Sequence, residues 1–476
     1  METRYAHRIA QTFLRNILMT ILILFTSSAA CSAADIGFSE AMGLLKARND
    51  SLQAARMEEN QRLHEQDAAR GLYLPEIDLS GRYTRIDEPI TIDLDGIRQA
   101  MGAVETALHG PVGAATVSQV PPFRVEVQSD AYWKADVSLR WPIYAGGRIS
   151  ALNRAADAAV ESSREKYRET ESHLTSRLAG LYFGLGLAWQ VEQVRQEVLS
   201  GMDAHLHQAQ QLEKNGMIAR SERLHAEVAR AEADRQLKRA IHDTRIAQTA
   251  LNNLLAGRED IHPLTPMVMV SQLEPLDYFQ ETAQRKNPVL GQLGAQKEMA
   301  HQASEKETGT LYPEISLFGK RELYTDDLTV LDPQWAVGIG INFKIFDGMS
   351  RYHRVQAAKD QEYRVFHLDK EARRDIATLV ESRYQELQKA REQYDAIKSS
   401  LVSAEEYLRV ETKAFEEGMA TSVDLVDAQL ALSRVRIERL QTLYECDVAL
   451  AELLETSGMS DRYMEYLSLG ETAGEQ

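Results

Sequence analysis

The sequence contains an internal repeat, and a repeat of this length limits the architecture more than any single motif does. Leu74-Pro75-Glu76-Ile77 is matched by Tyr312-Pro313-Glu314-Ile315, at an offset of 313 − 75 = 238 residues. Ile143-Tyr144-Ala145-Gly146 is matched by Ile345-Phe346-Asp347-Gly348, at an offset of 345 − 143 = 202 residues. The first copy therefore carries 238 − 202 = 36 additional residues between its two strand-like stretches. We predict a chain that is built twice from one plan.

The N-terminus, residues 1–34, is predicted to be a secretory signal peptide. Arginines precede a short apolar stretch, Ile17 to Phe25, and small residues follow it. This is the order of a signal peptide, and the apolar stretch is too short for a spanning helix. We expect cleavage before Ala34 or Asp35. A second interpretation stays open, in which the mature chain begins at a lipidated Cys31.

Charge and composition narrow the class of protein. The chain has 476 residues and a formal net charge of −17. This charge argues against a nucleic-acid partner, because phosphate binding needs clustered lysine and arginine. Beyond the signal peptide, no stretch comes near the ~18 apolar residues of a membrane helix. If Cys31 is removed, only Cys446 remains, and an intrachain disulfide cannot form.

Stretches at about 131–144 and 334–346 alternate between apolar and polar side chains, which is the period of a β-strand. Weaker alternation at about 76–86 and 313–324 predicts one partner strand in each copy. The two strong stretches have the length of a tilted membrane strand, with aromatic residues at both ends as in an interfacial girdle. The residues that we expect to face lipid are Trp133, Val137, Leu139, Trp141, Trp335, Val337, Ile339, Ile341 and Phe343.

These four strands leave two interpretations of the sheet. In one, the sheet is half-buried in a soluble protein, although no spare amphipathic element is evident to cover its apolar face. In the other, the apolar face contacts lipid. Four strands cannot close a barrel, and open strand edges in lipid leave backbone groups unpaired at several kcal/mol each. The membrane interpretation therefore requires several copies, and three copies give 3 × 4 = 12 strands around a water-filled bore.

Two segments, 148–215 and 351–417, contain no proline and no turn cluster, so each predicts a helix of roughly 100 Å. Apolar residues in the second segment recur with alternating spacings of three and four, as in a coiled-coil seam. Gly216 and Gly418 are predicted to end these helices in the left-handed conformation, before a return helix in each copy. The seam residues are Leu387, Ala390, Tyr394, Ile397, Leu401, Ala404 and Leu408.

The repeat divides the chain into four parts after the signal peptide. They are a first structural repeat at 35–256, a connector at 257–286, a second repeat at 287–458 and a C-terminal tail at 459–476. The connector is rich in proline, and we expect a short helix near Leu276 to Lys286. The additional residues of the first copy, about 87–130, are predicted to form an outside loop with a helix near Ile97 to Leu108. This loop is expected to cover part of a pore.

The order of helix, two strands, long helix, glycine turn and return helix, present twice, resembles the TolC-like outer-membrane efflux proteins. The most specific segment is Glu417-Gly418-Met419-Ala420-Thr421-Ser422-Val423-Asp424-Leu425-Val426-Asp427-Ala428, which is similar to the periplasmic tip of that family. The Leu-Pro-Glu-Ile and Tyr-Pro-Glu-Ile strand starts add to the resemblance. It extends from about Phe38 to about Gly458 and covers nearly the whole mature chain.

The resemblance implies a membrane α+β fold. Each chain of a homotrimer would contribute four β-strands to a 12-strand outer-membrane β-barrel (3 × 4 strands). A long antiparallel α-helical coiled-coil barrel would continue it into the periplasm. The implied function is a passive exit duct in a tripartite efflux or type I secretion system. The implied partners are two further copies, outer-membrane lipid, a periplasmic adaptor and an inner-membrane transporter, without cofactor, metal or nucleic acid.

In the family, acidic residues surround the periplasmic entrance, and by position they correspond to Glu222, Asp424 and Asp427. Asp424 and Asp427 are three residues apart and share one helix face. Threefold symmetry would gather these like charges, which would raise their pKa values and favour cations at a closed pore. Phe415 and Ala420 replace a tyrosine and an arginine that help to hold the prototype's entrance shut. Neither residue can make those hydrogen bonds, so this entrance would close by other contacts.

The two tip turns are the second candidate site. Asn215-Gly216-Met217 is matched by Glu417-Gly418-Met419 at the offset of 202 residues. In the family this region contacts the adaptor. The resemblance therefore implies an adaptor-docking role for Gly216, Met217, Gly418 and Met419, whereas turn geometry alone would also explain the glycines.

Other function classes have weaker support in the sequence. It contains no nucleophile elbow, phosphate loop or cysteine metal cluster, so we expect no enzyme. Glu222-x-x-His225 and Glu298-x-x-His301 have di-iron spacing, but they lie at non-equivalent positions of the repeat and lack companion glutamates. The alternative function is a non-conducting, exported coiled-coil protein that spaces envelope layers, which would not need alternating apolar strands. The nature of the cargo, drug or polypeptide, stays open.

Overall fold

The computed structural model describes residues 34–110, 124–257, 260–325 and 333–472. They form two compact units. The first unit contains the chain up to Glu59, Ser162–Gly294 and the chain from Leu368 onward, and the second contains Asn60–Glu161 and Ala295–His367. Most of the predicted signal peptide, including Cys31, lies outside the described residues.

The main helices occur in the same order in the two copies. Equivalent helices begin 276 − 38 = 238 residues apart before the strands and 350 − 148 = 202 residues apart after them. In the first copy they are α2 (Phe38–Arg48), α3 (Asp50–Gly71), α6 (Arg148–Lys214) and α7 (Arg220–Leu254). In the second copy they are α8 (Leu276–Lys286), α9 (Pro288–Gly309), α10 (Ser350–Glu416) and α11 (Ser422–Ser457). The short helix predicted near Leu276 to Lys286 is confirmed as α8.

Asn49 and Asn287 join successive helices in the same way in the two copies. The Asn49 side-chain oxygen accepts from the backbone N–H groups two and three residues ahead, at 3.0 and 3.3 Å, and so caps α3. Its amide nitrogen donates to the Leu254 carbonyl oxygen at 3.1 Å. Asn287 caps α9 in the same manner and donates to the Thr456 carbonyl oxygen at 2.7 Å. Each buried asparagine therefore ties the start of one helix to the end of the return helix.

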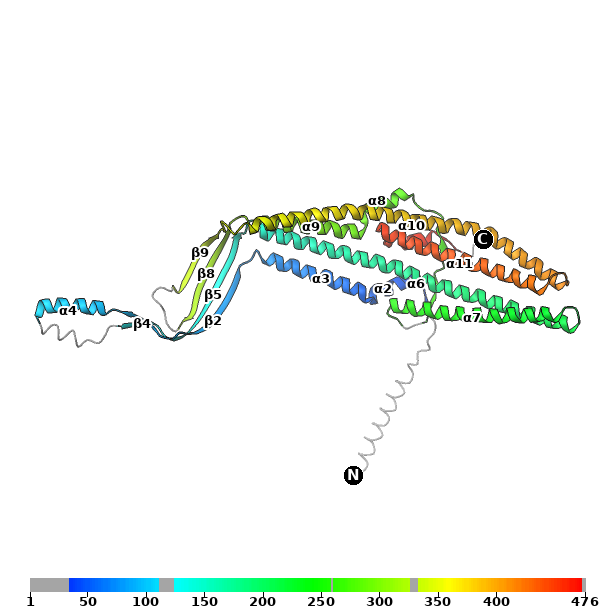
Figure 1. Cartoon of the computed structure of the whole chain (residues 1–476), viewed down its shortest axis with the longest axis horizontal. Coiled ribbons are helices and arrows are strands. Elements are labelled where there is room, and N and C mark those ends of the chain that lie inside the picture. The colour runs from blue at the N-terminus through cyan, green and yellow to red at the C-terminus, as the bar shows by residue number, and fades with distance from the viewer. Residues whose placement is uncertain (1–33, 111–123, 258–259, 326–332, 473–476) are drawn as a thin grey trace, which may run out of the picture. The chain divides into compact units, whose positions relative to one another are not determined.

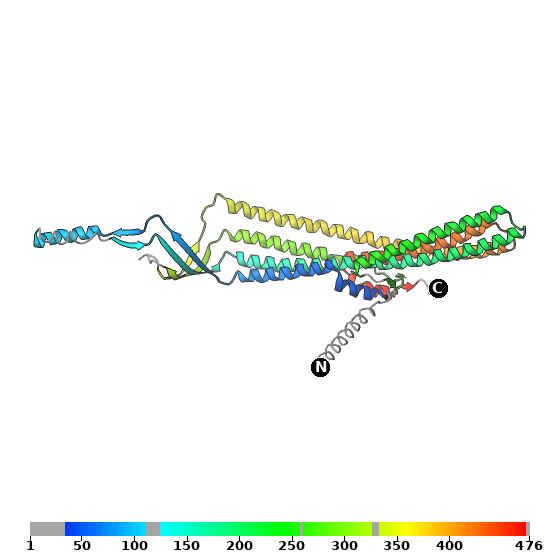
Figure 2. The same ribbon diagram turned by 90° about the horizontal axis from the view of Figure 1, so that it is seen from below.

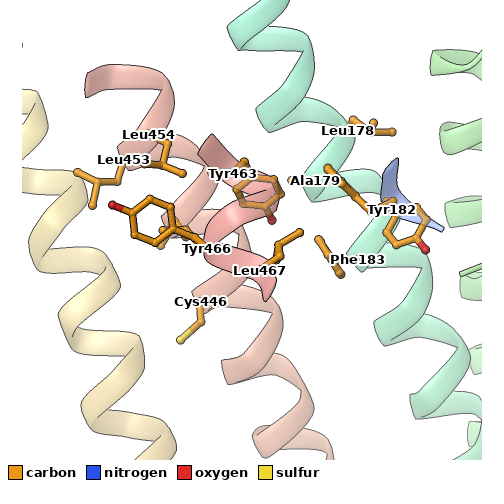
Figure 3. Packing of buried hydrophobic residues seen from close by; sticks show 14 of the residues in the cluster. Leu178, Ala179, Tyr182, Phe183, Cys446, Leu453, Leu454, Tyr463, Tyr466 and Leu467 are labelled. Carbon is orange, nitrogen blue, oxygen red and sulfur yellow. The ribbon is translucent and has the colours of Figure 1, made fainter. Parts of the chain in front are cut away.

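The core of the first unit is aromatic and aliphatic. The Phe38 ring of α2 lies 5.4 Å from Tyr182 and 5.5 Å from Phe183, both on α6. It also lies 5.3 Å from Tyr463, the first residue of the short helix α12 (Tyr463–Ser468), which follows the 3-10 helix η1 (Ser460–Arg462). Figure 3 shows side chains from α6, α11 and α12 meeting in this core. Such pairs fix helix orientation because edge-to-face and offset rings pack best.

Most of the predicted coiled-coil seam on α10 is confirmed as a buried face. Leu387, Ala390, Tyr394, Ile397 and Ala404 are buried, whereas Leu401 and Leu408 are half-buried. In the first unit, Figure 2 shows the hairpins α6–α7 and α10–α11 running side by side, with their two turns at the same end. The alternating three- and four-residue spacing thus provides the packing surface of a hairpin.

Two short strand pairs in the first unit were not predicted from the sequence. β1 (Ala34–Ile36) pairs in parallel with β6 (Ile261–Pro263), and β7 (Val268–Met269) pairs antiparallel with β10 (Glu471–Thr472). Strands of two or three residues are too short to show a period of two. They attach both ends of the described chain to the connector between the copies.

The second unit contains a four-stranded antiparallel sheet, seen in Figure 1. Its strands are β2 (Glu76–Arg85), β5 (Ala131–Tyr144), β8 (Glu314–Thr325) and β9 (Trp335–Asn342). Their order is β2-β5-β8-β9, so the strands of the first copy meet those of the second through the β5–β8 pair. Within the described residues, β2 and β9 each have one edge without a partner strand.

β9 is shorter than the stretch 334–346 predicted from the sequence. It ends at Asn342, which pairs with Glu314, the first residue of β8. Pro313 immediately precedes β8 and has no N–H to donate to the ladder, so Phe343 lies beyond β9. A second irregularity falls at Pro142, where the β5–β8 register shifts and Tyr144 takes the place opposite Ile315 that alternation gave to Ile143.

The additional residues of the first copy form a hairpin and a helix. β3 (Ile90–Asp93) pairs antiparallel with β4 (Arg124–Gln128), and α4 (Asp95–His109) lies between them in the chain. The helix predicted near Ile97 to Leu108 is confirmed, and the hairpin was not predicted. Residues 111–123 of the predicted loop lie outside the described residues.

Candidate functional site

One face of the four-stranded sheet is largely apolar across all four strands, and Arg321 of β8, opposite Val137 and Trp335, interrupts it near one end. The strand register places Leu79 of β2 opposite Val137 of β5, and Leu317 of β8 opposite Ile339 of β9. Residues that pair across strands share a face. Val337 and Ile339 are 69% exposed and Ile341 is 70% exposed, so no other part of the described chain covers them. The predicted lipid-facing residues on this face are Trp133, Val137, Leu139, Trp141, Trp335, Val337, Ile339 and Ile341.

The other face of the sheet carries ion pairs. Lys134 Nζ lies 2.9 Å from Glu322 Oε1, and Arg140 donates to Glu76 Oε2 at 2.9 Å. The Ser80 hydroxyl donates to Asp136 Oδ1 at 2.9 Å. A sheet with one exposed apolar face and one charged face fits a boundary between lipid and water.

Tryptophans lie near both ends of β5 and contact neighbouring residues. The Trp141 indole N–H donates to the Tyr73 carbonyl oxygen at 2.9 Å. Trp133, near the other end of the same strand, packs against Tyr83 with ring centroids 5.1 Å apart. Tryptophan and tyrosine at both ends of an apolar band are typical of membrane-facing strands.

The two tip turns have the same backbone geometry. Gly216 and Gly418 have φ values of 70° and 73°, in the left-handed region that glycine tolerates. The N–H of Met217 donates to the Leu212 carbonyl oxygen at 2.8 Å, and Met419 donates to Ala414 at 2.8 Å. Each of these is the six-to-one hydrogen bond of a Schellman motif, one in each turn. Met217 and Met419, which follow the glycines, are 68% and 74% exposed.

The acidic residues of the tip have different local roles. Asp424 closes a capping box at the start of α11, where its carboxylate accepts from the Thr421 N–H and hydroxyl at 2.9 and 2.7 Å. These hydrogen bonds lower the pKa of Asp424 in the single chain, opposite to the rise expected for clustered acids. Glu222 Oε2 accepts instead from the Ser422 N–H at 2.9 Å. Asp427 is exposed.

A buried histidine lies beneath the tip and was not singled out from the sequence. His205 Nε2 lies 2.6 Å from the Ser422 hydroxyl, and its ring packs edge-on to Phe415 with centroids 4.8 Å apart. Burial lowers the pKa of His205, and the charge of His225 lowers it further, while Glu222 opposes both. Phe415 is therefore a buried packing partner of His205. No spacing signal links residues 205 and 422.

The described residues bear on two further possibilities, a membrane-spanning helix and a metal site. No helix in this part of the chain combines the length and the apolar character that crossing a bilayer requires. No group of three or more histidine, cysteine, aspartate or glutamate side chains there is placed to hold a metal ion. Cys446 is buried, and burial raises its pKa to about 12.

Comparison with known sequences identifies relatives of the chain. The profile of the family described as outer membrane efflux protein matches residues 41–257 and 280–459. The outer membrane efflux protein BepC of Brucella suis is 22% identical over 311 residues, which cover 64% of this chain and 67% of BepC. The protein CyaE of Bordetella pertussis is 23% identical over 308 residues, which cover 62% of this chain and 64% of CyaE. Each match spans about two thirds of the relative.

Solved structures share the fold. The CmeC outer membrane channel of Campylobacter jejuni has a TM-score of 0.70 at 15% identity, covering 91% of this chain and 90% of CmeC. The MtrE outer membrane channel of Neisseria gonorrhoeae, in its open state, has a TM-score of 0.70 at 16% identity, covering 91% of this chain and 94% of MtrE. CusC has a TM-score of 0.73 at 13% identity, covering 90% of this chain and 93% of CusC. The chain therefore belongs to the outer membrane efflux protein family, and it is a protein of the outer membrane with the fold of these channels.

Proposed function

We propose that the chain is the outer-membrane channel of a tripartite efflux or type I secretion system. It gives a passive, non-enzymatic exit duct from the periplasm across the outer membrane. An inner-membrane pump and a periplasmic adaptor deliver the substrate. Family membership and the names of the channel relatives support this proposal.

The observation that carries the proposal is the exposed apolar face of a sheet whose two edge strands, β2 and β9, each have one unpaired edge among the described residues. An open edge in lipid leaves backbone N–H and C=O groups unpaired, which costs several kcal/mol for each group. β2 of one copy pairing with β9 of the next removes both edges. Three copies give 3 × 4 = 12 strands, enough for a barrel with an aqueous bore. The charged face, with Lys134 and Glu322, then lines that bore.

The helices supply the periplasmic part of the duct. In three copies, the hairpins α6–α7 and α10–α11 form an α-helical barrel, and the tip turns are its entrance. Met217 and Met419 are exposed apolar side chains on rigid Schellman turns, which suits them to contact an adaptor. Gly216 and Gly418 hold these turns in shape.

We place an acidic ring at the entrance. Asp424 and Asp427 occur three times around the axis of a trimer, and such a ring favours cations. Asp427 is exposed and Asp424 caps its helix, so Asp427→Asn is the cleaner change. We expect Asp427→Asn to lower the cation selectivity of the closed channel in single-channel recordings. Unchanged ion preference removes Asp427 from the ring.

The proposed trimer is tested with two variants of β9, each of which adds one positive charge to a different face of the strand. Ile339→Arg puts a cation in the middle of the apolar face of β9, at a cost of about 2–4 kcal/mol per subunit near the bilayer midplane. Asn342→Arg puts the same charge on the other face, beside Glu314. Outer membranes are extracted in mild detergent, and unheated and heated samples are compared by gel mobility.

We expect Ile339→Arg to lose the heat-modifiable trimer and Asn342→Arg to keep it. If the Ile339→Arg protein assembles as well as the wild type, the apolar face does not contact lipid. A mature protein that is a monodisperse monomer in detergent-free buffer contradicts the channel and favours the envelope-spacing alternative.

A further inference from the structure

The helix α4, in the loop between β2 and β5, carries an apolar stripe that nothing in the described chain covers. Its side chains are strongly exposed: Ile97 57%, Met101 63%, Val104 58% and Leu108 71%. None of the α4 side chains that the structure describes is buried. The spacings are four, three and four residues, which is the spacing of a coiled-coil seam.

A helix of this kind is marginal alone. α4 has 15 residues and contains Gly96 and Gly102, and each glycine costs about 1 kcal/mol relative to alanine. Isolated helices of about this length are barely stable in water even in alanine-rich sequences. Packing of the apolar stripe against a partner is therefore the expected source of its stability.

The charges on α4 disfavour a lipid surface as that partner. Helices that lie on membranes are rich in lysine and arginine and bear aromatic residues on the apolar side. α4 has no lysine and no aromatic residue, and its charged side chains, Asp95, Arg98 and Glu105, sum to 1 − 2 = −1. The single arginine is already in an ion pair within the helix, with Arg98 Nε 3.1 Å from Asp95 Oδ1.

The residue types in the stripe select the number of helices. Spacings of four, three and four assign Met101 and Leu108 to position a of the heptad, and Ile97 and Val104 to position d. A γ-branched or unbranched residue at a with a β-branched residue at d favours three or four strands over two. The flanking g positions, Ala100 and Ala107, are small and let helices approach closely.

We propose that the α4 helices of three copies pack along this stripe as a parallel three-stranded coiled coil that covers the outer mouth of the channel. This inference rests on the proposed trimer. A loop between two strands of each copy occurs three times around the axis of a closed ring, which supplies three parallel copies of one seam. The occupant of the exposed stripe is then the same stripe of the other two chains.

Cysteine cross-linking with a short trifunctional maleimide tests the proposal in intact outer membranes. Val104→Cys places a thiol at a d position, where three copies converge. Thr106→Cys, on the exposed opposite side of the same helix, is the matched control. The wild-type chain reports any background, and Cys446 is buried with its pKa raised to about 12, so it reacts poorly.

We expect a covalent trimer from Val104→Cys and little from Thr106→Cys. Equal cross-linking of both variants, or of neither, overturns the α4 coiled coil. The heat-modifiable trimer is followed in the same samples, because a trimer that persists without the Val104 cross-link leaves the channel proposal intact. Loss of the trimer in the wild-type sample contradicts the channel proposal and the inference together.

A conductance measurement tests the α4 coiled coil by a route that does not depend on thiol chemistry. Val104→Glu places three carboxylates in one layer of the seam, and their repulsion separates the helices. Thr106→Glu adds the same charges on the exposed side. We expect a higher single-channel conductance for Val104→Glu only, and equal conductance of the two variants contradicts a cap made by α4.

Discussion

Glu222 accepts a hydrogen bond at 2.9 Å from the backbone N–H of Ser422, so a side chain of the first tip hairpin caps the return helix of the second. The equivalent position in the second copy, 222 + 202 = 424, is Asp424, which caps its own helix through Thr421. The first copy has Ala219 at the N-cap of α7, where no side chain makes a cap hydrogen bond. Without a partner at Ala219, Glu222 is available to connect the two hairpins.

Glu222→Ala is expected to loosen the start of α11. The change leaves the Ser422 N–H without its acceptor and removes a negative charge from a helix N-terminus, together worth about 1 kcal/mol. Hydrogen exchange of a peptide covering residues 415–426 is expected to speed up several-fold. Glu222→Gln keeps an acceptor and is expected to show a smaller effect, while Asp427→Ala, an exposed carboxylate, is the control. Equal exchange in Glu222→Ala and the control would falsify the cross-hairpin cap.

The tip is expected to loosen as the pH falls, because His205 is buried. Its pKa in the folded chain is lowered from the ordinary value of 6.5, chiefly by burial. The unfolded chain then binds the proton more readily, so the stability from neutral His205 is present above about pH 6.5 and declines as the pH falls toward the lowered pKa. His225, which also lowers the pKa, and Glu222, which raises it, face the same ring.

The measurement is hydrogen exchange at the tip between pH 7.5 and 5, corrected for the intrinsic exchange rate. His205→Gln keeps a hydrogen-bonding side chain but does not titrate, so its profile is expected to be flatter than that of the wild type. His207→Gln, two residues away and exposed, is expected to retain the wild-type profile. A wild-type profile in His205→Gln assigns the pH dependence to another group.

Asn287→Ala is expected to destabilise the first unit by about 2–4 kcal/mol. The change removes an N-cap, worth about 1 kcal/mol, and leaves the buried Thr456 carbonyl oxygen without its donor, worth about 1–3 kcal/mol. Asn287→Asp keeps the cap but cannot donate, so it separates the two contributions. Thermal unfolding of the detergent-solubilised protein measures the stability of both variants. Asn49→Ala is expected to have the same effect as Asn287→Ala.

Asp447→Asn is expected to stabilise the protein at neutral pH. Asp447 is fully buried, with one hydrogen bond at 3.2 Å from the Val268 N–H, and burial raises its pKa well above the ordinary 3.8. The folded chain holds the proton more tightly than the unfolded chain, so stability falls as the pH rises from about 4 through the raised pKa. Asparagine stays neutral and keeps the acceptor for Val268.

The midpoint of thermal unfolding is measured at pH 5 and 7.5. Asp447→Asn is expected to raise the midpoint at pH 7.5 more than at pH 5, whereas Asp461→Asn, at an exposed position, is expected to change neither. A variant less stable than the wild type at pH 7.5 contradicts the cost assigned to the buried carboxyl group.

Met419→Asp is expected to lower export without disturbing assembly. The side chain is exposed beside the Gly418 turn, so aspartate causes no folding penalty but removes the apolar contact that we propose for the adaptor. A loss of about 1.4 kcal/mol in docking is a tenfold loss of affinity. Export of a reporter drug is compared with trimer yield, and Met57→Asp, exposed on α3, is the control. Normal export from Met419→Asp excludes this side chain from docking.

The elements of the fold were largely predictable because their signals are local. The long helices end at Gly216 and Gly418, where a left-handed φ is needed and glycine alone adopts it at little cost. The period of two in 131–144 and 334–346 predicted β5 and β9, and weaker alternation predicted β2 and β8. The exposed apolar face was predictable for the same reason, since alternate residues of a strand share a side.

The tertiary structure decided what depends on residues far apart in the chain. Pro313 ends the β8–β9 ladder and shortens β9 at Asn342, although alternation in β9 continues past that point. His205 and Ser422 are 217 residues apart, and their contact follows only from the packing of two hairpins. The sequence by itself determined where the long helices and the strands of the four-stranded sheet begin and which faces are apolar, because those properties arise between near neighbours. The tertiary structure alone decided which polar groups are buried together, because burial is set by the packing of distant segments.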